Sequence, residues 1–133
     1  MTSLEATSRP GRSGPGASPP AARTIVRLDG ALDVAAAPAL RERLIGLLHT
    51  GTPLLVLDLS RVPSCDSAGL AVLVGAERRA RMLGIAMRLA APSVPVAKLL
   101  RLTGLDRNLA VYPDLHGALA AERHQPASPA YDD

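Results

Sequence analysis

The chain has 133 residues, enough for one domain and too few for two of ordinary size. Apolar residues make up 47% of it and aromatic residues only 2%, so its core must be aliphatic and it lacks the aromatic platforms on which nucleic-acid bases stack. The net charge of +3 comes from interleaved acids and bases, and therefore indicates neither a nucleic acid nor any other particular partner.

Both ends of the chain have the composition of disordered tails. Residues 1–22 contain four Pro, three Gly and four Ser, and residues 124–133 are similarly poor in apolar side chains. We therefore predict one folded domain over residues 23–123. We also expect the segment before Arg23 to supply no strand.

Between these tails, patterns typical of strands alternate with patterns typical of helices. The predicted strands cover residues 24–28, 54–59, 85–90 and 109–112. The predicted helices are one from Pro38 that ends before Gly51, then 67–83, 93–102 and 113–123. This alternation predicts an α/β domain with a mixed central sheet of about four to five strands and about four helices.

The segment 56–70 carries the most information about function. A nearly continuous aliphatic run predicts a strand buried on both faces, and a short loop then leads to a helix that begins at Asp66-Ser67. Ala68 and Gly69 are small, which leaves the Ser67 hydroxyl unobstructed, and a helix N-terminus tolerates an anion such as phosphate. The alternative is that Asp66 or Ser67 only caps the helix.

Three blocks of the sequence resemble the STAS domain of the anti-sigma factor antagonist family. The first is Leu28-Asp29-Gly30-Ala31-Leu32-Asp33, followed by Ala36, Pro38 and Leu40. The second is Leu57-Asp58-Leu59-Ser60 through Asp66-Ser67-Ala68-Gly69-Leu70. The third is Ala91-Pro92-Ser93 with Val96, Leu99 and Leu100, then Thr103-Gly104-Leu105. Together they cover about residues 24–122.

The resemblance implies a protein-interaction switch that regulates sigma-factor-dependent transcription. In that family an ATPase-type anti-sigma factor, which is also a serine kinase, phosphorylates the serine that corresponds to Ser67, and a phosphatase removes the phosphate. The implied partner surface consists of Asp33, Asp66, Ser67, Ala68, Gly69, Leu70 and Ser93. Asp58 matches a motif position that fixes the loop, and Ser93 is expected to cap the third helix.

The sequence contains no motif that indicates an enzyme. Cys65 is a single cysteine, which excludes an intrachain disulfide, and it reads as a lone buried thiol rather than a redox centre. The chain has no G-x-S-x-G elbow, no phosphate-binding G-x-x-x-x-G-K-[ST] loop and no histidines at metal-ligand spacing. We therefore expect no catalytic residue, no cofactor and no metal.

Two further expectations concern charge and location. Arg78, Arg79 and Arg81 form a basic cluster, either a solvated face with a Glu77–Arg81 pair or a docking site for an acidic partner. No apolar run reaches the length of a membrane span or a secretory signal, so we expect a cytoplasmic protein that contacts no membrane. A second interpretation retains the fold but makes the chain a subunit of a stress-signalling or lipid-transport complex, without phosphorylation of Ser67.

Overall fold

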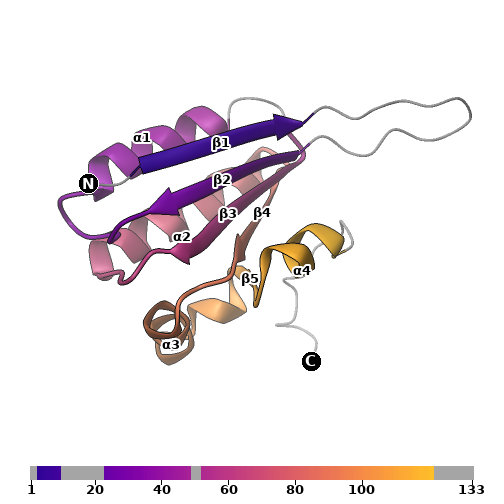
Figure 1. Cartoon of the computed structure of the whole chain (residues 1–133). Coiled ribbons are helices and arrows are strands. Elements are labelled where there is room, and N and C mark those ends of the chain that lie inside the picture. The colour runs from indigo at the N-terminus through magenta and orange to yellow at the C-terminus, as the bar shows by residue number, and fades with distance from the viewer. Residues whose placement is uncertain (1–2, 10–22, 49–51, 122–133) are drawn as a thin grey trace, which may run out of the picture.

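The computed structural model describes residues 3–9, 23–48 and 52–121 of the chain. Within these ranges, five strands form one sheet and four α-helices connect or flank them (Figure 1). The predicted α/β class, the mixed sheet and the number of helices are thereby confirmed. None of the helices in these ranges is long and apolar enough to cross a membrane.

The strands lie in the sheet in the order in which they occur along the chain. They are β1 (Ser3–Arg9), β2 (Arg23–Asp29), β3 (Leu54–Arg61), β4 (Ala86–Ala90) and β5 (Ala110–Tyr112). The first pair, β1 and β2, is antiparallel, and the remaining neighbours are parallel. Because the parallel strands point the same way, their carboxyl ends meet at one edge of the sheet.

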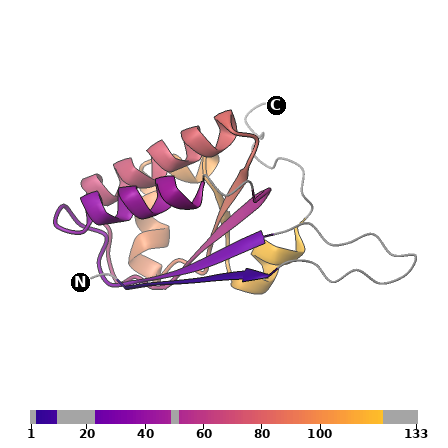
Figure 2. The same ribbon diagram turned by 90° about the horizontal axis from the view of Figure 1, so that it is seen from above.

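The helices cover the two faces of the sheet unequally. Figure 2 shows α1 (Ala37–Leu47) and α2 (Ser67–Met82) side by side on one face, with α4 (Leu115–Ala120) on the other. Apolar side chains of α3 (Val94–Leu102) pack into the same core as those of α1 and α2. A short 3₁₀ turn, Leu105–Arg107, follows α3.

Alternate side chains of a strand point to opposite faces of the sheet, and in β3 they contribute to two separate apolar clusters. In β3, Leu55, Leu57 and Leu59 belong to the main cluster beneath α1, α2 and α3. The alternate residue Val56 joins the smaller cluster beneath α4, where it packs with Ala118. The prediction that this strand is buried on both faces is confirmed, which explains why its aliphatic run shows so little alternation.

The N-terminal prediction is wrong for part of its length. Ser3–Arg9 forms β1 and pairs with β2 over seven residues, so the folded unit begins before Arg23. Composition reports how much apolar surface a segment can bury, whereas an added edge strand is held mainly by backbone hydrogen bonds that almost any sequence can make. The rest of the predicted tails, residues 1–2, 10–22 and 124–133, lies outside the described residues.

Two helix ends also differ from the predictions. The helix α1 ends at Leu47, several residues before Gly51, and Gly51 itself lies outside the described residues. The helix α4 begins after its cap Asp114 and stops at Ala120, because Ala121 has an extended backbone. Apolar periodicity places a helix but does not fix its last turn.

Candidate functional site

Three loops meet at the carboxyl edge of the parallel strands: the β2–α1 loop, the β3–α2 loop and the β4–α3 loop. Backbone hydrogen bonds join the first two of them. In the loop after β2, the Leu32 amide donates to the Ser64 carbonyl at 3.0 Å. The Leu32 carbonyl in turn accepts from the Asp66 amide at 3.1 Å. These two bonds bring the first and second motif blocks, more than thirty residues apart in sequence, into direct contact.

Asp66 is the N-cap of α2 and also ties that helix to the neighbouring loop. Its Oδ1 accepts hydrogen bonds from the amides of Ala68 at 2.8 Å and Gly69 at 3.1 Å. Its Oδ2 accepts from the amide of Val34 at 3.1 Å. One carboxylate therefore satisfies two of the otherwise unpaired N–H groups at the helix start and holds the β2–α1 loop in place.

Ser67 is the first residue of α2 and lies exposed on the surface. No hydrogen bond between described residues uses its hydroxyl, because Asp66 already provides the cap. Of the two capping alternatives that the sequence left open, the structure assigns the role to Asp66 and leaves Ser67 available. The expected unobstructed hydroxyl is thus present.

Asp33 lies in the loop that Asp66 holds, at the turn before α1. Its Oδ1 accepts from the Ala36 amide at 3.0 Å, and its carbonyl accepts from the Ala37 amide at 2.9 Å. Asp33 therefore orders the start of α1 and is half-buried. Its loop, rather than its carboxylate alone, lies beside the Ser67 loop.

Three other residues expected at the partner surface face inward to different degrees. Leu70 is only 8% exposed and belongs to the main core, and Gly69 is also buried, so both support the site instead of presenting a surface. Ala68 is half-buried. The expectation that Gly69 and Leu70 belong to an exposed surface is thereby corrected. A sequence motif that runs along a helix includes residues of the buried face as well as of the exposed face.

The prediction that the Ser93 side chain caps α3 is wrong. Its backbone is extended at the start of the helix, but its hydroxyl donates to the Val62 carbonyl at 2.8 Å instead of accepting from a helix amide. This bond joins the third loop to the loop that leads to Ser67. Ala91, two residues earlier, has a left-handed backbone with φ of 55°, a conformation that is uncommon for a residue with a Cβ.

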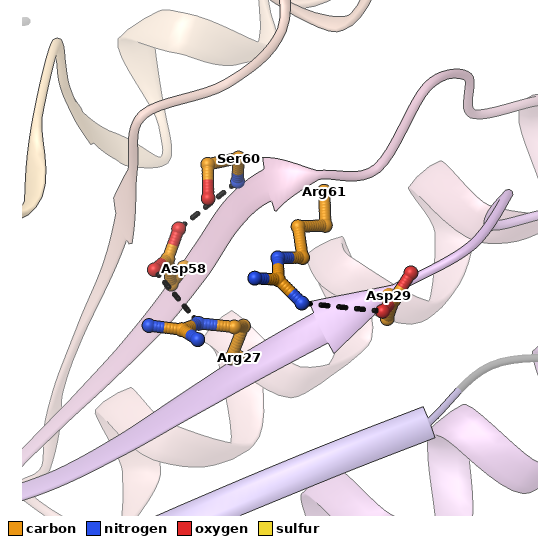
Figure 3. A network of polar contacts seen from close by, with 5 residues as sticks. All are labelled: Arg27, Asp29, Asp58, Ser60 and Arg61. Atoms are coloured by element: carbon orange, nitrogen blue, oxygen red, sulfur yellow. Dashed lines mark hydrogen bonds and ion pairs between the residues drawn. The ribbon is translucent and has the colours of Figure 1, made fainter.

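Asp58 holds the end of β3, as the motif implied, and Figure 3 shows its contacts. Its Oδ1 accepts from the Ser60 amide at 2.9 Å, and its Oδ2 lies 3.6 Å from Nε of Arg27 on β2. Nearby, Arg61 and Asp29 approach to 3.9 Å, but both are exposed and such pairs contribute little. The residues of Figure 3 therefore fix the strand ends from which the loops emerge.

The thiol of Cys65 is half-buried between Ser64 and Asp66. Burial, and secondarily the negative charge of Asp66, raises the pKa of Cys65 to about 11. The thiol is therefore protonated near neutral pH, which is the opposite of what a reactive cysteine requires.

Two exposed valines near these loops were missed by the sequence analysis. Val34 follows Asp33 and is 71% exposed, and Val94 follows Ser93 and is 81% exposed. Helical spacing could have revealed the exposure of Val94, because this residue lies outside the buried face that Val96 and Leu100 define on α3. Val34 lies in an irregular loop, where periodicity gives no such signal.

Comparison with known proteins agrees with this geometry. The sequence model of the STAS domain matches residues 16–118. The anti-sigma-B factor antagonist of Bacillus subtilis is 36% identical over 80 residues, which is 60% of this chain and 72% of that protein. An anti-sigma factor antagonist from Mycobacterium paratuberculosis has a similar structure, with a TM-score of 0.66, 27% identity, and coverage of 90% of this chain and 96% of that one.

The chain belongs to the STAS domain family. The fold extends to other kinds of protein: a sulfate transporter family protein from Wolinella succinogenes superposes with a TM-score of 0.62 at 24% identity, over 72% of this chain and 80% of that one. At that identity the likeness concerns the fold alone. The similarity to anti-sigma factor antagonists rests on sequence as well as structure.

Proposed function

We propose that this protein is an anti-sigma factor antagonist controlled by phosphorylation of Ser67. Unphosphorylated, it binds an ATPase-type anti-sigma factor that is also a serine kinase, and phosphorylation releases that partner until a phosphatase restores Ser67. The observation that carries the proposal is the exposed Ser67 hydroxyl, which has no hydrogen-bond partner among the described residues and lies at the start of α2. The named relatives support it.

Several other hydroxyls of the described residues are already hydrogen-bonded and are therefore less suitable acceptors of a phosphate. Thr24 is buried and bonded to Thr52, while the hydroxyls of Ser93 and Thr103 donate to backbone carbonyls. Ser64 is exposed like Ser67 and lies only three residues away. It therefore offers a matched control for specificity.

The cap explains how a phosphate would act. The amides of Ala68 and Gly69, which would otherwise stabilise an anion, are already bonded to Asp66. A phosphate on Ser67 would thus add roughly −1.5 to −2 charges beside an existing carboxylate, and this charge would face the partner. We expect binding to change much more than folding, with a shift in melting temperature below about 5 °C.

The test compares Ser67→Ala and Ser67→Asp with the unmodified protein in capture from the native cell, followed by identification of the bound protein and intact-mass analysis. We expect Ser67→Ala to retain an anti-sigma factor under all conditions and Ser67→Asp to lose it. Ser64→Asp adds the same charge three residues earlier, in the loop before α2, and should bind as the unmodified protein does.

Three results would contradict the proposal. One is equal capture by Ser67→Ala and Ser67→Asp, and another is phosphate mapped to Ser60, Ser64 or Ser93 after incubation with the kinase and ATP. The third is capture of stress-signalling or lipid-transport components with Ser67 unmodified, which would favour the alternative role as a subunit of such a complex.

A further inference from the structure

A shallow groove of about 240 Å³ lies between α1 and α2, outside the loops described above. Its apolar lining comes from Leu44 and Ile45 on α1 and from Val72 and Ala76 on α2. Enclosed pockets for small molecules are usually larger, about 300–1,000 Å³. A groove of this volume between two helices suits side chains of another protein.

The groove is basic at both ends. Figure 2 shows α1 and α2 side by side, and they run in the same direction because each connects parallel strands. Arg41 on α1 therefore lies near Ala71, at the Ser67 end, and Arg79 lies about 12 Å further along α2. Neither arginine forms an ion pair with a described residue, and the lining contains no acidic side chain.

The rest of the basic cluster on α2 is already neutralised in part. Arg81 Nη2 lies 3.0 Å from Glu77 Oε2, which confirms the predicted pair on that side of the helix. Burial raises the pKa of Glu77 despite this contact. The two uncompensated charges of Arg41 and Arg79 therefore belong to the groove and not to the Glu77 side.

Gly75 forms part of the groove wall at the middle of α2. A glycine inside a helix costs about 0.5–1 kcal/mol relative to alanine, yet a Cβ at Gly75 would meet no atom within 4 Å. Packing within this chain thus gives no reason for the missing side chain. At this position the glycine leaves room for a second backbone or a large side chain to enter the groove.

We infer that this groove binds an acidic amphipathic helix of the partner protein, with one end of that helix beside Ser67. Its apolar stripe would enter between Leu44 and Val72, and acidic residues about two turns apart would pair with Arg41 and Arg79. The inference rests on the proposed function only for the identity of the partner. It adds a docking surface that continues from Ser67 along α2.

The test uses the full chain labelled with ¹⁵N and two synthetic amphipathic peptides that differ only in charge. Both carry Leu at helical spacing and two charged residues seven positions apart, Glu in one peptide and Lys in the other. We expect the Glu peptide to shift the amide signals of Ile45, Ala71 and Gly75 saturably, and the Lys peptide to leave them unchanged. The double variant Arg41→Glu/Arg79→Glu should weaken the Glu peptide at least about tenfold and bind the Lys peptide instead.

Filling the groove provides an independent check. Gly75→Leu should reduce binding of the Glu peptide by a similar factor. Gly46→Leu is the matched control, because Gly46 is also in a helix with open space around it but does not line the groove. Both changes replace glycine by a better helix former, so neither should prevent folding.

Absence of binding, equal binding of the two peptides, or shifts confined to another surface would overturn the inference. So would groove signals that move when the protein alone is diluted, which would show that a second copy occupies the groove. The peptide measurements need no phosphorylation and no native partner. Failure of the Ser67 variants to alter capture would therefore contradict the proposed function without affecting this result.

Discussion

Gly69 lies where α2 passes the loop after β2, and the structure leaves no space for a side chain there. A Cβ at this position would overlap the carbonyl oxygen of Leu32 and lie 2.9 Å from Sγ of Cys65. The same Leu32 carbonyl accepts a hydrogen bond from the Asp66 amide. Any displacement of this carbonyl would therefore loosen the loop that leads to Ser67. Gly69 therefore acts on the site by allowing two backbones to approach.

We predict that Gly69→Ala lowers the free energy of unfolding by about 2 kcal/mol, as overpacking of a tight site does. Gly75→Ala on the same helix should raise it by about 0.5–1 kcal/mol, because nothing opposes the added methyl group. Urea denaturation of the two variants measures both values. Equal effects of the two substitutions would contradict this account of Gly69.

The raised pKa of Cys65 gives a second prediction at the residue scale. Since the thiolate is the reactive form, a pKa of about 11 leaves roughly a hundredfold less thiolate at pH 8 than an ordinary cysteine has. Alkylation of the folded protein by iodoacetamide should therefore become faster with each pH unit up to about 11. In urea, where burial is lost, the rate should level off above about pH 9. A plateau at the same pH in both states would disprove the shift, whatever the absolute rates.

At the scale of elements, α4 is attached to the sheet through a buried arginine. Arg88 on β4 is 1% exposed, and its Nη1 donates to the carbonyls of Ala118 at 2.7 Å and Ala121 at 3.2 Å. Its guanidinium also lies 5.7 Å from the centre of the Tyr112 ring. A cation thus satisfies carbonyls at the carboxyl end of a short helix, where the helix dipole favours positive charge.

Replacing this arginine should release α4. We predict that Arg88→Met, which keeps much of the volume but not the donors, lowers the free energy of unfolding by about 2 kcal/mol. Hydrogen exchange should show loss of protection in α4 before any other element. Arg101→Met, an exposed arginine on α3, is the control and should change neither quantity. Unchanged protection of α4 in Arg88→Met would show that its apolar contacts alone hold it.

At the scale of the whole molecule, β1 covers an edge of β2 that the parallel strands do not use. Without it, β2 would present a row of unpaired N–H and C=O groups, a template for pairing with another chain. As the edge strand on this side, β1 therefore places a polar segment, Ser3–Arg9, outside the more apolar β2.

Deletion of residues 1–9 should lower stability and cause self-association that increases with protein concentration. Light scattering coupled to gel filtration measures the mass, and a chain shortened by residues 128–133 controls for truncation. A deletion variant that stays monomeric at all concentrations would show that β2 is protected in another way.

The amino-acid sequence by itself determined the order and kind of most elements and the start of α2 at Asp66-Ser67. Apolar spacing depends on which side of an element is buried, so it reveals β3 from Leu54 onward and the inner stripe of α2 without knowledge of what packs there. Motif resemblance added the family and the expected role of Ser67.

Only the tertiary structure decided matters that depend on partners distant in the chain. The pairing of Ser3–Arg9 with β2, the bond from Ser93 to Val62, the burial of Arg88 beneath α4 and the tight contact of Gly69 with Leu32 all join segments that local periodicity treats separately. The physical reason is that these hydrogen bonds and close contacts depend on two segments that come together only in the folded protein. A chain read in order shows the apolar side of each element, whereas the groups that meet across elements become defined only when the sheet and its loops assemble.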